Sequence, residues 1–109
     1  MITEDRLTKA LVYLAHSDQE CAEAKSWVAK SEYLAKLKEA FAFKSAKGDT
    51  VKDREVAAKT DEDAQKCWNI HFEEIVKYEQ IRAKRELESL IVDLDRTISA
   101  NRRQGSGQV

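Results

Sequence analysis

The chain contains no proline, and only one glycine, Gly48, lies before residue 105. Proline and glycine are the residues that most often end helices and form the tight turns of β-hairpins. A chain of 109 residues with one such break is suited to a few long helices, and not to a turn-rich β-sandwich or barrel. Charged residues make up 36% of the chain, and Lys, Glu and Arg are good helix formers, which favours an all-α fold.

Capping residues divide the first half of the chain. Thr3 is followed by two acidic residues that suit the positive end of a helix dipole, so it predicts a helix start. Ser17, with Glu20 three residues later, has the pattern of a capping box. We therefore expect a short helix over residues 4–15, a kink near Ser17 and a second helix over residues 18–46. The alternative is one continuous helix with Ser17 facing solvent.

The second half begins at the only strong break. Gly48 stands where a C-terminal capping glycine belongs, and Thr50 is a candidate N-cap. Residues 51–59 permit a helix but are weakly patterned, so they form either the turn or a short helix. A last helix is expected over residues 60–101, with its first threonine as a second cap candidate. Residues 102–109 contain two glycines and no anchor, which predicts a flexible tail.

The two arms have matching lengths. At about 1.5 Å per residue each arm is roughly 62 Å long, which predicts one antiparallel, coiled-coil-like hairpin domain over residues 1–101. The numbers of facing residues should add up to about 99, or up to about ten more if the turn is larger. In either register Cys21 and Cys67 are well over about 10 Å apart, so we expect two reduced thiols and no disulfide.

Each arm carries more apolar side chains than a two-helix hairpin can cover. The first arm has a stripe of Cys21, Ala24, Trp27/Val28, Leu34, Leu37/Lys38 and Phe41, and the last arm has Ala64, Cys67/Trp68, His71, Ile75, Tyr78, Ile81/Arg82, Leu87, Leu90/Ile91, Leu94 and Ile98. The aromatic residues add a second line to each arm, so one line should face another chain. We therefore predict that the protein is a homo-oligomer or needs a partner. Its predicted interface is Trp27, Phe41, Trp68, Phe72 and Tyr78, with both tryptophans at least half buried.

Candidate catalytic and metal-binding residues are few. Cys67, His71 and Glu74 could share one helical face, but the chain has no second Cys/His pair to complete a zinc or di-metal site. Residues 16–18 (His-Ser-Asp) are adjacent in sequence, whereas a catalytic triad is assembled in space around an oxyanion hole. No glycine-rich phosphate loop is present in the sequence. We expect no enzymatic activity, no metal, no cofactor and no small-molecule substrate.

The apolar runs of the chain are short. The longest, residues 10–15, falls far below the roughly 20 residues that a membrane span needs. The first residues lack the basic and apolar regions of a secretory signal. We therefore expect a cytoplasmic protein that does not enter a membrane.

Basic residues gather in local groups, although the net charge is −1. Arg82, Lys84 and Arg85 form one group, and Arg102 with Arg103 forms another near the C-terminus. Both groups are candidate phosphate contacts, with single-stranded DNA as the expected ligand. The alternative is a solvated helical face on which these cations pair with neighbouring glutamates.

Four segments carry a resemblance: residues 7–15 (LTKALVYLA), 21–25 (CAEAK), 78–85 (YEQIRAKR) and 99–103 (SANRR), with the capping box between the first two. In this order they resemble small all-helical proteins that tailed phages and prophages encode among genes for recombination and single-strand handling. The resemblance implies an accessory protein of the bacterial host cytosol that binds DNA or a recombination protein. The alternatives are an inhibitor of a host or defence protein, and an assembly chaperone of the virion.

Overall fold

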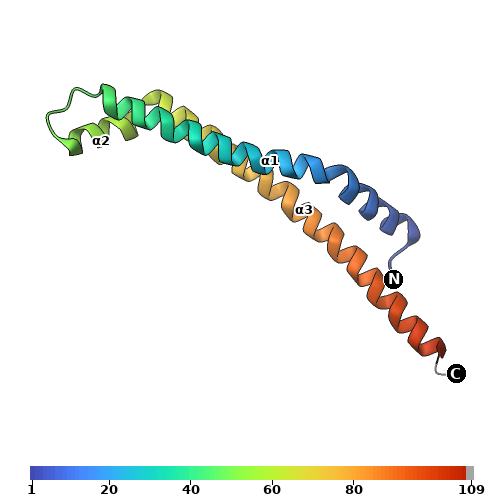
Figure 1. Cartoon of the computed structure of the whole chain (residues 1–109). Helices are drawn as coiled ribbons and strands as arrows, with labels where there is room; N and C mark the ends of the chain where they lie inside the picture. The colour runs from blue at the N-terminus through green and yellow to red at the C-terminus, as the bar shows by residue number, and fades with distance from the viewer. Residues whose placement is uncertain (108–109) are drawn as a thin grey trace. The chain divides into compact units, whose positions relative to one another are not determined.

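The computed structural model describes the backbone of residues 1–107 and the side chains of residues 1–105. The described residues form three helices and no strand: α1 (Glu4–Ser45), α2 (Val51–Thr60) and α3 (Glu62–Gly107) (Figure 1). The predicted all-α class, with long helices on both sides of a central break, is confirmed. The segment after Gly48 that permitted either a turn or a helix forms α2.

The chain divides into two compact units, where the sequence had suggested one domain over residues 1–101. The first unit combines Met1–Cys21 with the described part of Gln80–Val109, and the second unit is Ala22–Glu79. In each unit a segment of α1 packs against an antiparallel segment of α3. The bonded pairs are Arg6–Glu88 and Ser17–Arg85 in the first unit, and Ser31–His71 and Glu39–Trp68 in the second. Each unit is therefore a helical hairpin in its own right.

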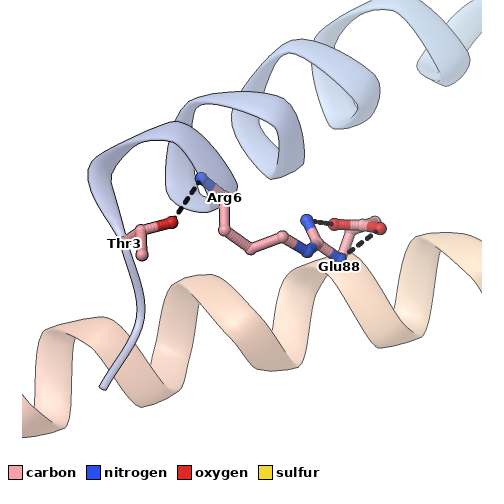
Figure 2. A network of polar contacts seen from close by, with 3 residues as sticks. All are labelled: Thr3, Arg6 and Glu88. Atoms are coloured by element: carbon pink, nitrogen blue, oxygen red, sulfur yellow. Dashed lines mark hydrogen bonds and ion pairs between the residues drawn. The ribbon is translucent and has the colours of Figure 1, made fainter.

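Two of the predicted helix caps are present. The Thr3 hydroxyl accepts a hydrogen bond from the backbone N–H of Arg6 at 3.1 Å (Figure 2). The Thr50 hydroxyl accepts one from the backbone N–H of Asp53, also at 3.1 Å. Each cap satisfies a backbone donor in the first turn that has no partner within the helix.

The cap of α3 differs from the prediction by one residue. The Asp61 carboxylate accepts a hydrogen bond from the backbone N–H of Ala64 at 2.9 Å, so Asp61, and not Thr60, caps α3. Thr60 is the last residue of α2, and its hydroxyl donates to the Val56 carbonyl at 2.7 Å. The side chain of Thr60 is thus already bonded to the preceding helix.

Each alternative for Ser17 is only partly correct. Helix α1 passes through Ser17 without interruption, so the single continuous helix is confirmed, and the division into two helices with Ser17 as a cap is wrong. Ser17 is also not in solvent, because it is only 2% exposed and faces α3. A small side chain at this position allows α3 to approach α1 closely.

Gly48 is not a left-handed helix cap, because neither it nor any other described glycine has a positive φ. A Cβ atom on Gly48 would lie 2.7 Å from the Cβ of Asp53, which is too close for a real contact. The Gly48 carbonyl accepts a hydrogen bond from Nε of Arg54 at 3.2 Å. Glycine is needed here because the loop closes tightly against the start of α2.

The helix predicted to end near residue 101 continues to Gly107. Residues 102–107 of the expected tail are therefore helical, and residues 108–109 lie outside the described part of the chain. A glycine inside a helix costs only about 1 kcal/mol relative to alanine, so Gly105 does not have to end α3.

The surface between α1 and α3, here called the seam, has small and polar residues at its most buried positions. Its buried residues are Ala10, Ala35, Ala64 and Val92 and the polar Ser17, Ser31, His71 and Glu88, while Ala58 is buried on α2. Larger apolar side chains such as Tyr78 and Ile81 are partly buried along it. Small side chains let two helix backbones approach closely, but they bury little apolar area. Of the buried side chains, only that of Val92 is a large aliphatic one.

The predicted apolar stripes are wrong in several positions. Trp27, Leu34 and Phe41 are 54%, 50% and 56% exposed, and they lie beside the seam instead of in it. The same holds for Leu87, Leu90 and Leu94, which are 56%, 64% and 53% exposed. Seam positions follow one another along α3 at residues 78, 81, 85, 88 and 92, at spacings of three or four residues. Arg85 and Glu88 occupy two of these positions, so two charged side chains lie in the seam. Leu87, Leu90 and Leu94 point outward as a consequence.

A seam of small residues should not tolerate larger ones. Ala35 is fully buried, so Ala35→Leu should lower the free energy of unfolding by about 1–3 kcal/mol through overpacking. The control is Ala29→Leu at an exposed position of α1, which should change it by less than about 0.5 kcal/mol. Urea unfolding of the two variants tests this, and equal effects would contradict the close packing of the seam.

Candidate interaction surfaces

An ion pair closes the seam of the first unit (Figure 2). Arg6 donates two hydrogen bonds to the Glu88 carboxylate, at 2.6 and 2.8 Å. The Glu88 side chain is 9% exposed and that of Arg6 is 38% exposed, so the pair is partly shielded from water. The hydrogen bonds from Arg6 hold the pKa of the Glu88 carboxyl below its ordinary value of 4.5, although burial acts in the opposite direction.

Arg85 makes a second polar link in the same unit. Its Nη1 donates to the Leu14 carbonyl at 2.9 Å and to the Ser17 hydroxyl at 2.6 Å, and its Nη2 donates to Asp18 at 3.2 Å. The side chain of Arg85 is only 23% exposed. Arg85 is therefore not a free surface cation, because its guanidinium joins α3 to α1, and its predicted phosphate contact stays a prediction.

The other predicted nucleic-acid residues are exposed on α3, and one of them also contacts α1. Lys84 is exposed and its ammonium lies 4.3 Å from the centre of the Tyr13 ring. Arg82 pairs with Glu86 at 3.4 Å, and Arg102 and Arg103 are exposed on the last turns of the helix. These residues do not form one basic patch with Arg85, because its guanidinium points to α1.

The seam of the second unit contains His71, which is 6% exposed. The Ser31 hydroxyl donates to the Val28 carbonyl and lies 3.0 Å from Nδ1 of His71. The tautomer of His71 decides which of these two groups donates. His71 also meets the Trp68 ring edge-on at 5.6 Å. His71 is thus held as a packing residue of the seam.

The residues considered for chemistry are dispersed or already bonded. Cys21 and Cys67 are free thiols, and His16 is exposed while its neighbour Ser17 is buried against Arg85. Among the described residues, no three His, Cys, Asp or Glu side chains come together as a metal site. No described helix has an apolar stretch that could cross a membrane.

One apolar surface, here called the Trp27 face, lies on one side of the second unit. Trp27, Leu34 and Phe41 come from α1, and Cys67 and Ile70 come from α3. A hollow of about 160 Å³ lies between Trp27, Leu34, Cys67 and Ile70. The Lys30 ammonium covers one end of it, 5.0 Å from the centre of the Trp27 ring. Spacings of seven residues place the three α1 side chains in one line along the helix.

A second apolar surface, here called the tip groove, lies where α2 meets the other two helices of the second unit. It is an open groove of about 520 Å³ with Ala40 and Phe43 of α1, Ala58 of α2 and Trp68 of α3 as its apolar lining. Its charged lining residues are Lys36, Glu39, Glu55 and Lys59. The Trp68 indole N–H donates to the Glu39 carboxylate at 2.8 Å, and its ring stacks on Phe72. In Figure 1, α2 follows the loop after α1 and runs back along it, which is how it reaches this groove.

The predicted interface residues divide between these surfaces. Trp27 and Phe41 lie on the Trp27 face, whereas Trp68 and Phe72 lie at the tip groove and beside it. The prediction that tryptophans are at least half buried is confirmed for Trp68, but Trp27 remains 54% exposed in the single chain. Tyr78 is partly buried.

Sequence reasoning missed the polar residues of the seam, chiefly Arg6, Glu88 and the inward-facing Arg85. A signal for them exists in the sequence. Small residues recur every seven positions at Ala10, Ser17, Ala24 and Ser31. This repeat indicates the side of α1 that packs against α3 and the register between the two helices. The sequence matches no protein-family model, and no curated protein and no solved structure matches it either.

The lowered pKa of Glu88 predicts a pH-dependent stability. The ionised carboxylate is favoured in the folded state, so its contribution is complete above the ordinary pKa of 4.5 and is lost as the pH falls through the lowered folded value. Glu88→Gln should therefore be destabilising at a pH of about 7 and much less so at about 3. Unfolding at the two pH values measures this. Glu86→Gln, at an exposed ion pair, is the control, and an equal pH dependence for both would contradict the assignment.

The role of Arg85 in the seam predicts a loss of stability when it is removed. Arg85→Ala leaves buried Ser17 without its charged partner and should cost on the order of 2 kcal/mol. Arg82→Ala, which removes a mostly exposed pair with Glu86, should cost less than about 1 kcal/mol. Thermal and urea unfolding distinguish the two, and an equal loss would mean that Arg85 acts only at the surface.

Proposed function

We propose that this chain is a non-enzymatic binding protein that acts through protein–protein contacts of its outward-facing apolar side chains. One observation carries the proposal: many large apolar side chains, among them Trp27, Leu34 and Phe72, are at least half exposed, while the most buried positions hold small or polar residues and Val92. The Trp27 face and the tip groove each gather such side chains in one place. Rimmed apolar surfaces of this kind are typical of sites where other proteins bind.

The exposure of single side chains supports the same proposal. Trp27, Leu34, Phe41, Ile70 and Phe72, all in the second unit, are each at least half exposed. A partner that covers them would bury apolar area that the single chain leaves in water.

The phage accessory role in recombination or single-strand handling is the second proposal. The exposure of Lys84, Arg102 and Arg103 favours it, since all three can reach phosphates. Against it stands Arg85, the most central member of the predicted set, whose guanidinium is bonded within the seam. We rank this proposal below protein binding for that reason.

Site-specific photo-crosslinking tests the leading proposal. A photo-reactive side chain at Phe72 or Leu34, both about half exposed, should crosslink to protein in cells that express the chain. The same side chain at Lys9, an exposed polar position of α1 in the first unit, is the control and should give little product. Crosslinks that are equal at all three positions, or that join the chain only to nucleic acid, would contradict the proposal.

Salt-dependent DNA binding tests the second proposal. Each phosphate contact adds about 0.7 to the slope of log affinity against log salt for single strands, so three contacts predict a slope near 2. Changing Arg102 and Arg103 together to Gln should reduce it to about 0.7, with no loss of helix content. Fluorescence anisotropy with labelled single-stranded DNA measures the slope. An absence of binding at low salt would end the nucleic-acid proposal.

A further inference from the structure

We propose that the partner of the Trp27 face is a second copy of this chain, related to the first by a two-fold axis that passes beside Leu34 and Ile70. The inference rests on the proposed function, because it names the occupant of one of the same apolar surfaces. The two hairpin units that meet would be the Ala22–Glu79 units, stacked face to face and antiparallel.

The residues of α1 on this face are arranged symmetrically about Leu34. Trp27 lies seven residues before it and Phe41 seven residues after it, so each aromatic is about 10.5 Å from Leu34 along the helix. An antiparallel copy centred on Leu34 brings Trp27 onto the partner's Phe41, and Phe41 onto the partner's Trp27. Such an exchange of the same contacts in both directions is the defining property of a two-fold interface.

The residues of α3 follow the same symmetry about Ile70. Leu34 and Ile70 border the same hollow, so one axis can serve both helices. Asp63 lies seven residues before Ile70 and Lys77 seven residues after it. The axis therefore brings Asp63 near the partner's Lys77. At the other end of the interface it brings Lys77 near the partner's Asp63. An unrelated partner would not require apolar and charged residues to be symmetric about the same point.

The charges elsewhere on the face permit this arrangement. The same axis places Lys30 near the partner's Lys38, but each of these has a local neighbour. Lys30 lies over the Trp27 ring, and Lys38 borders a small groove together with Asp61 and Asp63. The net charge of −1 means that two copies do not repel each other strongly at long range.

The energetics favour association of copies. Within one chain the buried apolar residues are four alanines and Val92, which is a thin core for a chain of this length. Trp27, Leu34, Phe41 and Ile70 are each at least half exposed in the single chain. Covering these four side chains buries large apolar residues, of which the most buried positions of the seam hold only Val92, so folding and dimer formation support each other.

A charge-swap experiment distinguishes a second copy from any other partner. Asp63→Lys and Lys77→Asp should each weaken the dimer about tenfold, because each places like charges together at both ends of the interface. An equimolar mixture of the two variants restores both opposite-charge pairs and should recover the wild-type dissociation constant. Sedimentation equilibrium of the purified full chain measures it. Dimers that do not recover on mixing would overturn the proposed axis.

A second variant tests the centre of the face. Leu34→Glu brings two carboxylates together at the axis and should shift the protein to monomers at micromolar concentration. The control is Tyr33→Glu, the neighbouring exposed residue on a different side of α1, which should leave the dimer intact. A wild-type chain that is monomeric, or a dimer unaffected by Leu34→Glu, would overturn the proposal. In that case the photo-crosslinks at Leu34 to another protein would still support the proposed function, so the two can fail separately.

Discussion

The packing of small side chains at the most buried positions between α1 and α3 influences which of the larger apolar side chains remain exposed. Ala10, Ser17, Ser31 and Ala35 present little bulk to α3, so the two backbones approach closely in both units. Small side chains at these positions bury little apolar area, and the largest apolar side chains of α1 lie to the side of them. Trp27 and Leu34 consequently lie beside the seam, although they follow the same seven-residue spacing as the residues inside it.

The polar contacts of the seam add little net stability, but they define the register between α1 and α3. Partly buried charges lose much of their Coulomb gain to desolvation, so the Arg6–Glu88 pair and the bonds of Arg85 are weak sources of net stability. They require one relative position of the two helices, however, because a shift by one residue would leave Glu88 buried without Arg6. Every buried polar side-chain atom in the described residues has a hydrogen-bond partner, which is consistent with a single register.

The proposed interactions follow from this division of roles. A hairpin that buries mostly small and polar side chains and leaves several large apolar ones exposed can gain further hydrophobic stabilisation from another molecule. The symmetric Trp27 face suits a second copy, while the tip groove at Trp68 leaves another apolar surface at the far end of the same unit. Binding of a partner and stability of the chain are then thermodynamically linked.

The sequence alone determined the helical class, the central break and two of the caps, because these depend on local chemistry: the absence of proline, one glycine, and the hydroxyls of Thr3 and Thr50. It also indicated that two apolar lines per helix exceed what one hairpin can bury. Only the tertiary structure decided which line faces inward. Periodicity gives the angle between Trp27 and Val28 on a helix but not which of them meets α3, because that choice depends on the closest approach of two backbones distant in sequence.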